Sequence, residues 1–171
     1  EEIVLRVSED DYWLYAADDV SREIYKVWYD DENKRHATSE VAPLQHPDTC
    51  FVALNRKAFG EGAERYAFRF FEVGQDLQVL GNPLVAKESL LVLDCGEEGR
   101  DKFVRTFCET QQLARRIAAE FNRRLDKLKR VDDRTPRVSF LDCSVYELND
   151  KNLGKQKVLV EEKLDHLAWH K

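Results

Sequence analysis

The segment over residues 101–129 constrains the fold of this chain more than any other, because its apolar residues recur at spacings of three and four. That spacing places them on one stripe of a helix, while arginines and other charged residues occupy the remaining faces. Residues 132–136, with two aspartates and a proline, end the pattern. We therefore predict one long amphipathic helix. Its apolar stripe consists of Phe103, Phe107, Thr110, Ala114, Ile117, Phe121, Leu125 and Leu128.

Strand patterns lie on both sides of this helix. They cover residues 50–54, 65–73 and 84–94 before it, and residues 138–148 and 158–160 after it. In the second of them, alternation places Arg65, Ala67 and Arg69 on one face. Glycine-containing turns are expected at 74–76, at 81–83, and at 149–155 as a hairpin loop. Because a hairpin joins antiparallel neighbours, the sequence predicts an α+β fold with a mostly antiparallel sheet packed on one helix.

The beginning of the chain carries further core-forming patterns. Residues 3–7 alternate between apolar and other residues, which predicts a short strand. The aromatic-rich segments 12–15 and 24–29 predict two more core elements, either helical or extended. All three contribute apolar side chains before the first long polar segment of the chain.

That polar segment covers residues 30–48 and contains Pro43 and Pro47, which favours a surface loop or linker. We expect a boundary there. It divides the chain into a variable N-terminal extension, residues 1–47, and a main domain, residues 48–171.

Composition argues against several functional classes. The net charge is −6 and the pI is near 5.3, so a nucleic-acid-binding surface is not expected. No run approaches the roughly 20 apolar residues of a membrane helix, and the first residues lack a signal-peptide pattern, which predicts a cytoplasmic protein without a membrane partner. The four cysteines are widely separated and include no C-x-x-C motif, so reduced thiols are expected.

Residues suited to bind a nucleotide surround the glycine turn at 59–65. Gly60 and Gly62 precede an alternating strand, and the following strand brings Lys87 out of an apolar run. Backbone N–H groups of such a turn, together with one fixed cation, can bind phosphates. Glu109 then follows on the predicted helix, where it could pair with Lys87. This order is typical of the ATP-binding lobe of a protein kinase.

Four separated segments together resemble the alpha-type (atypical) Ser/Thr protein kinases. They are Gly60–Phe68, Val85–Lys87, the helix from Thr106 to Asn122, and Val158–Glu162. Each motif alone is weak, but the ordered set is specific because four segments must match in sequence. The resemblance covers residues 50–171. It implies the N-terminal ATP-binding lobe of a kinase that transfers the γ-phosphoryl group of ATP to Ser or Thr of a protein substrate.

The resemblance also implies roles for individual residues. Lys87 would contact the ATP phosphates, Arg65 would be a second phosphate contact, and Glu109 would hold Lys87 in place. Glu161, with the backbone from Glu162 to Leu164, would line the adenine pocket. A lysine on a rigid strand acts as a point charge on phosphate oxygens, and a carboxylate fixes its rotamer. The glycine turn would contribute Gly60, Gly62 and Ala63.

Two features qualify this resemblance. The glycine segment reads G-x-G-x-x-R, unlike the G-x-G-x-x-G of conventional protein kinases. The resemblance also implies a second lobe after residue 171, with the Mg²⁺ ligands, the catalytic aspartate and a structural zinc site. We therefore predict no metal ligands within this chain, which alone would be catalytically incomplete. His166 and His170 are spaced as H-x-x-x-H but lack a third ligand nearby.

Each of these residues also has an ordinary structural explanation. The glycines could form a simple β-turn, Lys87 could protect an edge strand from aggregation, and Glu109 could pair with Arg105 one helical turn earlier. The alternative function is a non-catalytic scaffold derived from a kinase lobe, which predicts no stabilisation by ATP. An unrelated α+β domain is indicated if the glycine turn and Lys87 lie far apart in space.

Overall fold

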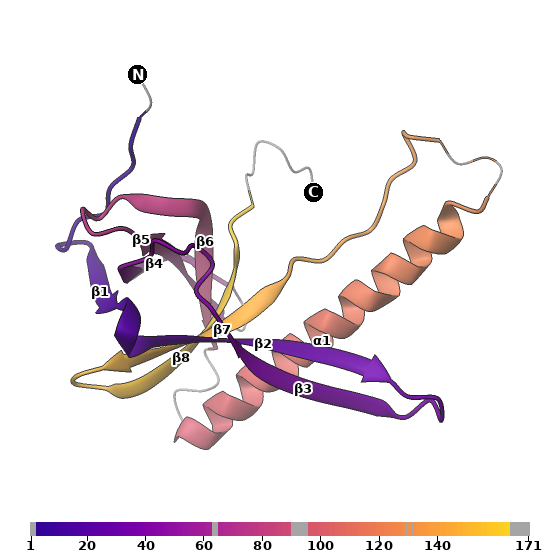
Figure 1. The fold of residues 1–171 in the computed structure, drawn as a ribbon, viewed down its shortest axis with the longest axis horizontal. Coiled ribbons are helices and arrows are strands. Elements are labelled where there is room, and N and C mark those ends of the chain that lie inside the picture. The colour runs from indigo at the N-terminus through magenta and orange to yellow at the C-terminus, as the bar shows by residue number, and fades with distance from the viewer. Residues whose placement is uncertain (1–2, 63–64, 90–95, 129, 131, 165–171) are drawn as a thin grey trace.

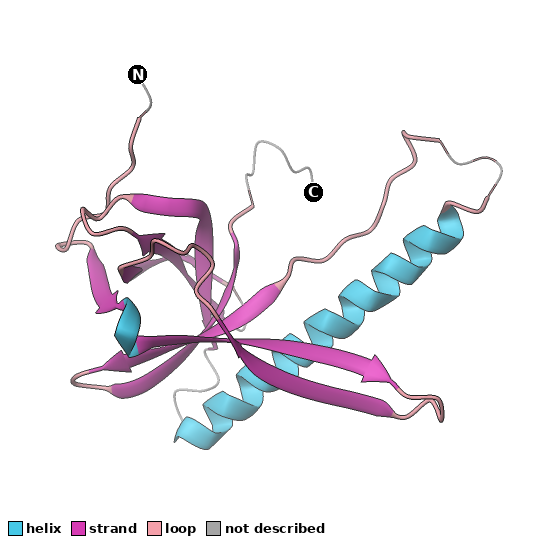
Figure 2. Cartoon of the chain, in the orientation of Figure 1, coloured by secondary structure: helices cyan, strands magenta, loops and turns pink. Residues whose placement is uncertain are grey.

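The computed structural model describes residues 3–62, 65–89, 96–128, 130 and 132–164. These residues form one eight-stranded antiparallel sheet and one long helix, α1 (Gly96–Leu125), which confirms the predicted α+β fold (Figures 1 and 2). Along the sheet the strand order is β1-β4-β5-β6-β8-β7-β2-β3. The strands are β1 (Tyr12–Ala16), β2 (Val20–Tyr29), β3 (Arg35–Ala42), β4 (Phe51–Glu61), β5 (Arg65–Val73), β6 (Val79–Ser89), β7 (Cys143–Asp150) and β8 (Gly154–Glu162).

The sheet buries apolar side chains on both faces, because successive residues of a strand point to opposite sides. On the helix face, which packs on α1, Val145 and Leu159 meet Val104 and Cys108. On the opposite face a larger core forms. It consists of Val52, Phe70, Leu84, Ala86, Tyr146, Leu148, Val158 and Val160. In β6, Leu84 and Ala86 therefore point into the larger core, and the alternate residues lie on the helix face.

The N-terminal predictions are partly wrong. Residues 3–7 form no strand and make one isolated bridge, between Arg6 and Gln78. The predicted loop over 30–48 contains β3, which pairs with β2 along a hairpin. The Asp30 carboxylate accepts backbone N–H bonds in the turn, and β3 is an edge strand whose exposed side chains are mostly polar. A polar edge strand resembles a loop in sequence. The segments 12–15 and 24–29 are extended, in β1 and β2.

Residues 81–83 do not form the predicted turn but lie inside β6. Gly81 has a φ of 67°, and the β5–β6 register shifts between Phe70 and Glu72, so this is an irregularity within a strand. A glycine that supplies a positive φ in a bulge gives the same local sequence as a turn. Strand β6 ends at Ser89, and the last part of the predicted strand, residues 90–94, lies outside the described residues.

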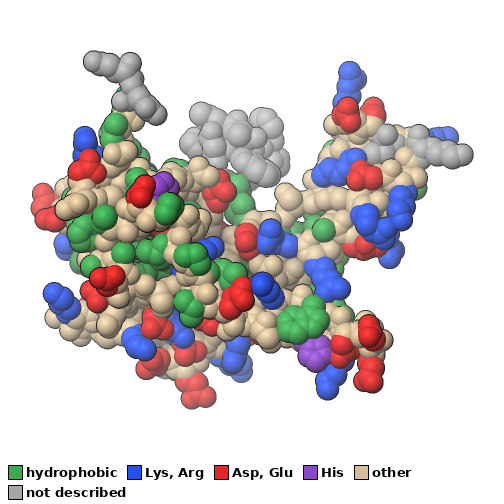
Figure 3. Space-filling view, viewed as in Figure 1, with side chains coloured by type: hydrophobic (Ala, Val, Ile, Leu, Met, Phe, Trp, Pro, Cys, Tyr) green, Lys and Arg blue, Asp and Glu red, His purple; other side chains and the backbone are tan. Residues whose placement is uncertain are grey.

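Helix α1 begins and ends earlier than predicted, and its buried side, with Val104, Cys108 and Ala118, is shifted by one residue from the predicted stripe. Ile117 and Phe121 are 61% and 51% exposed, whereas Val104 and Cys108 are 3% and 0% exposed. The end of α1 projects beyond the sheet (Figure 1), and Lys and Arg side chains gather over this region (Figure 3). Residues 132–142 run back along it as a loop, tied by the Asn122 side-chain amide to Val138, so β7 begins at Cys143 and not at residue 138.

Strands β1, β2 and β3, all within the first 47 residues, belong to the same sheet as the later strands. Strand β2 pairs with β7, β1 pairs with β4, and Tyr15 and Val20 pack against the larger core. The proposal that residues 1–47 are a variable extension of the domain remains a prediction about related sequences.

Candidate functional site

Arg65, Lys87 and Glu161 lie on the helix face of three adjacent strands. Ala67 of β5 is directly opposite Lys87 of β6, and Val85 of β6 is directly opposite Glu161 of β8. Arg65 and Glu161 are therefore diagonal neighbours of Lys87, one on each side. Diagonal neighbours lie about 7–8 Å apart, within reach of long side chains. The sheet thus brings three of the predicted site residues together, although Lys87 and Glu161 are 74 residues apart in sequence.

Lys87 forms its ion pair with Glu161. The Glu161 side chain is only 4% exposed and that of Lys87 is 29% exposed, so the pair is largely buried. The predicted Lys87–Glu109 pair is wrong. Glu109 instead accepts a 2.7 Å bond from Arg35 of β3, because this part of α1 faces the β2–β3 hairpin. Glu161, and not Glu109, is thus the carboxylate that pairs with Lys87, and no local sequence signal identified this contact.

The floor beside Lys87 is built from residues without long side chains. Gly60 of β4 is opposite Ala67 of β5, which is opposite Lys87. A Cβ added at Gly60 would lie 3.8 Å from the Ala67 Cβ, so among the described residues these two positions contribute no long side chain to the helix face. The β4–β5 hairpin that carries the glycines therefore lies beside β6, which carries Lys87, so the separation that would have kept the unrelated-domain alternative is not found. The hairpin itself uses the Gly62 N–H, which donates to the Arg65 carbonyl at 2.8 Å, and Ala63 lies outside the described residues.

Arg65 is held by aromatic rings of α1. Its guanidinium carbon lies 4.0 Å from the ring centroid of Phe107 and 5.6 Å from that of Phe103. The Arg65 Nε is buried and has no hydrogen-bond partner among the described residues. A buried N–H without an acceptor is costly, so this atom marks a place where an anion would be stabilised. The sequence assigned both phenylalanines to the apolar stripe alone, and their contact with Arg65 was not predicted.

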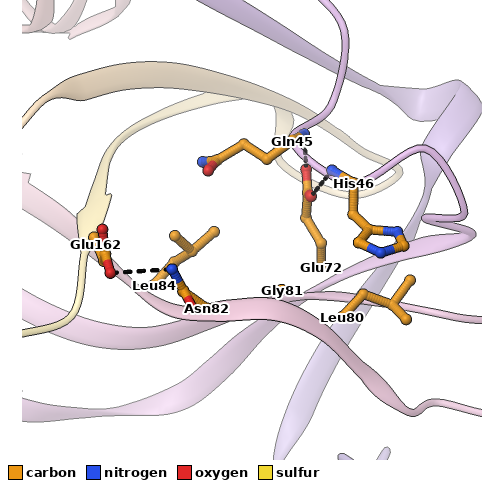
Figure 4. Close-up of a pocket in the computed structure, with 8 residues that line it drawn as sticks. All are labelled: Gln45, His46, Glu72, Leu80, Gly81, Asn82, Leu84 and Glu162. Atoms are coloured by element: carbon orange, nitrogen blue, oxygen red, sulfur yellow. Dashed lines mark hydrogen bonds between the residues drawn. The ribbon is translucent and has the colours of Figure 1, made fainter.

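Residues 162–164 continue from β8 along the irregular part of β6. Glu162 accepts a 3.1 Å bond from the Asn82 side chain, the Lys163 N–H donates to the Pro83 carbonyl at 2.9 Å, and Leu164 is 42% exposed. The Glu162 side chain lines a cavity of about 220 Å³ on the opposite face of the sheet, together with Glu72 (Figure 4). It therefore points away from Lys87, and an adenine contact at this residue would have to use the backbone.

Two buried thiols lie beneath the site. Cys143 is opposite Glu161 in the β7–β8 register, and its Sγ is 3.5 Å from the Sγ of Cys108 on α1. Both are free thiols, as is the more exposed Cys50. The hydrogen bond to Cys143, followed by burial, raises the pKa of the Cys108 thiol. Cys95 lies outside the described residues.

We expect Cys50 to react with iodoacetamide in the folded protein, while Cys108 and Cys143 react only after unfolding in urea. The nucleophile is the thiolate, and burial with a raised pKa suppresses it. Peptide mass spectrometry after alkylation at pH 8, with and without urea, measures each site separately. Labelling of Cys108 in native buffer at the rate of Cys50 would contradict the packing of α1 on β7.

The described residues contain no group of three or more His, Cys, Asp or Glu side chains placed to hold a metal ion. His166 and His170 lie beyond the part of the chain that the structure describes. Among the helices described, none is long and apolar enough to cross a membrane.

Comparison with known proteins identifies the family. The model of the alpha-kinase family matches residues 60–171, whereas no curated protein matches the chain. Among solved structures, the chain is similar to the apoenzyme alpha-kinase domain of myosin-II heavy chain kinase A, with 17% identity and a TM-score of 0.47 over 85% of this chain. The chain spans 62% of the length of that solved chain. Because the family match covers more than half of its residues, the chain belongs to the alpha-kinase family.

Proposed function

We propose that this chain is the ATP-binding lobe of an alpha-type protein kinase that transfers the γ-phosphoryl group of ATP to Ser or Thr of a protein substrate. The observation that carries the proposal is the arrangement on the helix face. Lys87, paired with Glu161, lies diagonal to Arg65, whose buried Nε lacks a partner among the described residues, and the small residues Gly60 and Ala67 lie beside them. Family membership by itself supports only a protein-kinase-related domain.

In this proposal the two cations have complementary roles. Lys87 is a compact point charge whose rotamer is fixed by a buried carboxylate, and Arg65 offers several N–H donors in one plane. Phosphoryl transfer depends mainly on positioning and on charges arranged before the reaction. The small residues Gly60 and Ala67 add no long side chain beside the two cations, which favours phosphate binding there. Glu161 serves the reaction through Lys87.

Magnesium would neutralise charge on the β- and γ-phosphates when bound with ATP. The described residues offer no cluster of three ligands for it. We propose that its ligands, the catalytic aspartate, a structural zinc site and the substrate-binding residues belong to a second lobe. On this view the lobe binds nucleotide by itself and transfers phosphate only as part of a longer cytoplasmic kinase.

Stabilisation by ATP tests the proposal on the chain itself. A site that binds only the folded state adds about 2.7 kcal/mol at a hundredfold excess of ligand over Kd, which thermal melting detects. We expect an ATP-dependent rise in Tm that Lys87→Met abolishes and that Lys26→Met preserves. Lys26 is a matched control, since it is a strand lysine paired with Glu40 away from the site. In the longer protein, radiolabel transfer from ATP to a basic protein substrate should fail with Lys87→Met.

A scaffold without chemistry is the second candidate, and the observation that favours it is that the Gly62 N–H, a predicted phosphate donor, already donates to the Arg65 carbonyl within the hairpin. It predicts a Tm that ATP leaves unchanged in wild type and in both lysine variants. The position of Arg65 and Lys87 on one face weighs against the scaffold. A scaffold gains nothing from a partly buried arginine for which the described residues offer no carboxylate partner.

A further inference from the structure

We propose that Phe107 is a positioning residue for Arg65, holding its guanidinium where the nucleotide phosphates bind. The inference rests on the proposed function, because it takes Arg65 as a phosphate contact. A positioning role would also explain why Phe103 and Phe107 are aromatic, since a place in the apolar stripe requires only an apolar residue.

Arg65 lies over two aromatic rings and has a buried Nε without a partner among the described residues, a combination that the structure gives for no other described arginine. Arg35, Arg115 and Arg137 pair with carboxylates, whereas Arg56, Arg69 and Arg116 each lie over a single ring, at 5.2, 6.0 and 5.2 Å from its centroid. For Arg65, no carboxylate partner is found among the described residues. Its guanidinium lies instead over the face of Phe107, at 4.0 Å from the ring centroid.

An aromatic ring holds a guanidinium in a different way from a carboxylate. The ring attracts the cation through its electron-rich face, and the N–H donors, which lie in the guanidinium plane, stay available. A carboxylate would occupy two of those donors and neutralise the charge. A ring is therefore the better support for an arginine whose N–H groups must bind an incoming anion.

The electrostatic balance of the face makes this support important. Lys87 is paired with Glu161, so these two residues together contribute little net charge. Arg65, one diagonal step from Lys87, supplies positive charge that no described residue cancels. Because ATP carries several negative charges on its phosphates, the position of Arg65 should strongly affect their binding.

The rings of Phe103 and Phe107, on which Arg65 lies, are held against the sheet by packing. Phe103 and Phe107 are one helical turn apart, with ring centroids 6.4 Å apart and ring planes 29° apart. Both pack against the core in which Val104 and Cys108 are 3% and 0% exposed. The rings thus have a fixed position relative to β5, which a positioning role requires.

The test compares ATP and adenosine binding to the chain by calorimetry, because adenosine has no phosphates. We expect Phe107→Leu to weaken ATP binding about five- to tenfold, the effect of losing a partly buried cation–π contact, and to leave adenosine binding within about twofold. Phe107→Tyr should restore ATP binding. Phe121→Leu, which changes a half-exposed phenylalanine of the same helix, is the matched control and should bind both ligands normally.

A second substitution keeps the test valid even if the Phe107→Leu protein does not fold. Pentafluorophenylalanine at position 107 keeps the size of the ring and reverses its charge distribution, so it should weaken ATP binding as Phe107→Leu does. If the fluorinated protein binds ATP with the same affinity as the wild type, the inference is overturned and the proposed function still stands. Equal weakening of ATP and adenosine would also overturn it, as a general packing effect. Failure of the wild-type protein to bind ATP would overturn the proposed function first.

Discussion

Glu72→Leu should lower the free energy of unfolding by about 3–5 kcal/mol, although it replaces a charged residue by an apolar one in the core. Glu72 is 1% exposed. Its carboxylate accepts the N–H groups of Gln45 and His46, each at 2.8 Å, and the hydroxyls of Thr49 at 3.3 Å and Tyr146 at 3.1 Å (Figure 4 shows the first two). Leucine would remove the acceptor from the two backbone N–H groups and from the buried Tyr146 hydroxyl, and residues 45–49 would lose these bonds to β5.

Urea unfolding followed by circular dichroism measures this loss. Glu40→Leu is the control, since Glu40 is an exposed strand glutamate in an ion pair with Lys26, and such changes usually stay within about 0.5 kcal/mol. Tyr146→Phe should give an intermediate loss, because it removes one of the four donors. If Glu72→Leu unfolds at the wild-type urea concentration, residues 45–49 are held by other contacts.

Local periodicity was sufficient to predict the long helix and several strands. The spacing of Phe103 and Phe107 identified the start of the buried stripe of α1, and the alternation of β5 placed Arg65 on the same face as Ala67. The same spacing failed at Ile117 and Phe121, because the buried side of α1 runs through Val104, Cys108 and Ala118, one residue away from the apolar stripe that the pattern selected. The edge strand β3 failed for a related reason, since an exposed strand needs no apolar residues.

The partner of Lys87 could not be predicted from local patterns. Strand β8 pairs with β6 although α1 and β7 lie between them in the sequence. The contact between Lys87 and Glu161 therefore depends on strand order and register. Glu109 had a suitable residue type and a plausible helix position, but its direction is set by the β2–β3 hairpin, which the sequence did not reveal. Family resemblance named Lys87 and Glu161 separately, and only the sheet brings them into contact.

Lys87→Met should destabilise the fold by about 3 kcal/mol, even though methionine suits a partly apolar strand. The reason is Glu161, whose side chain is 4% exposed and would be left buried without its lysine. Removing one member of a buried ion pair typically costs about 3–5 kcal/mol, and the 29% exposure of the Lys87 side chain favours the lower end. Replacing both members by apolar residues of similar size is often neutral or stabilising. Lys87→Met combined with Glu161→Leu should therefore recover most of the lost stability.

The double-mutant cycle, measured by urea unfolding and by ATP-dependent melting, separates folding from function. We expect the double variant to unfold near the wild-type urea concentration and yet show no stabilisation by ATP, because its phosphate-binding lysine is gone. Lys26→Met, which breaks an exposed pair, should change unfolding by less than about 1 kcal/mol and retain the response to ATP. A double variant that still responds to ATP would remove Lys87 from the nucleotide site. A single variant as stable as wild type would show that Glu161 finds another cation, for which Arg69, on the same face and diagonal to Lys87, is the nearest candidate.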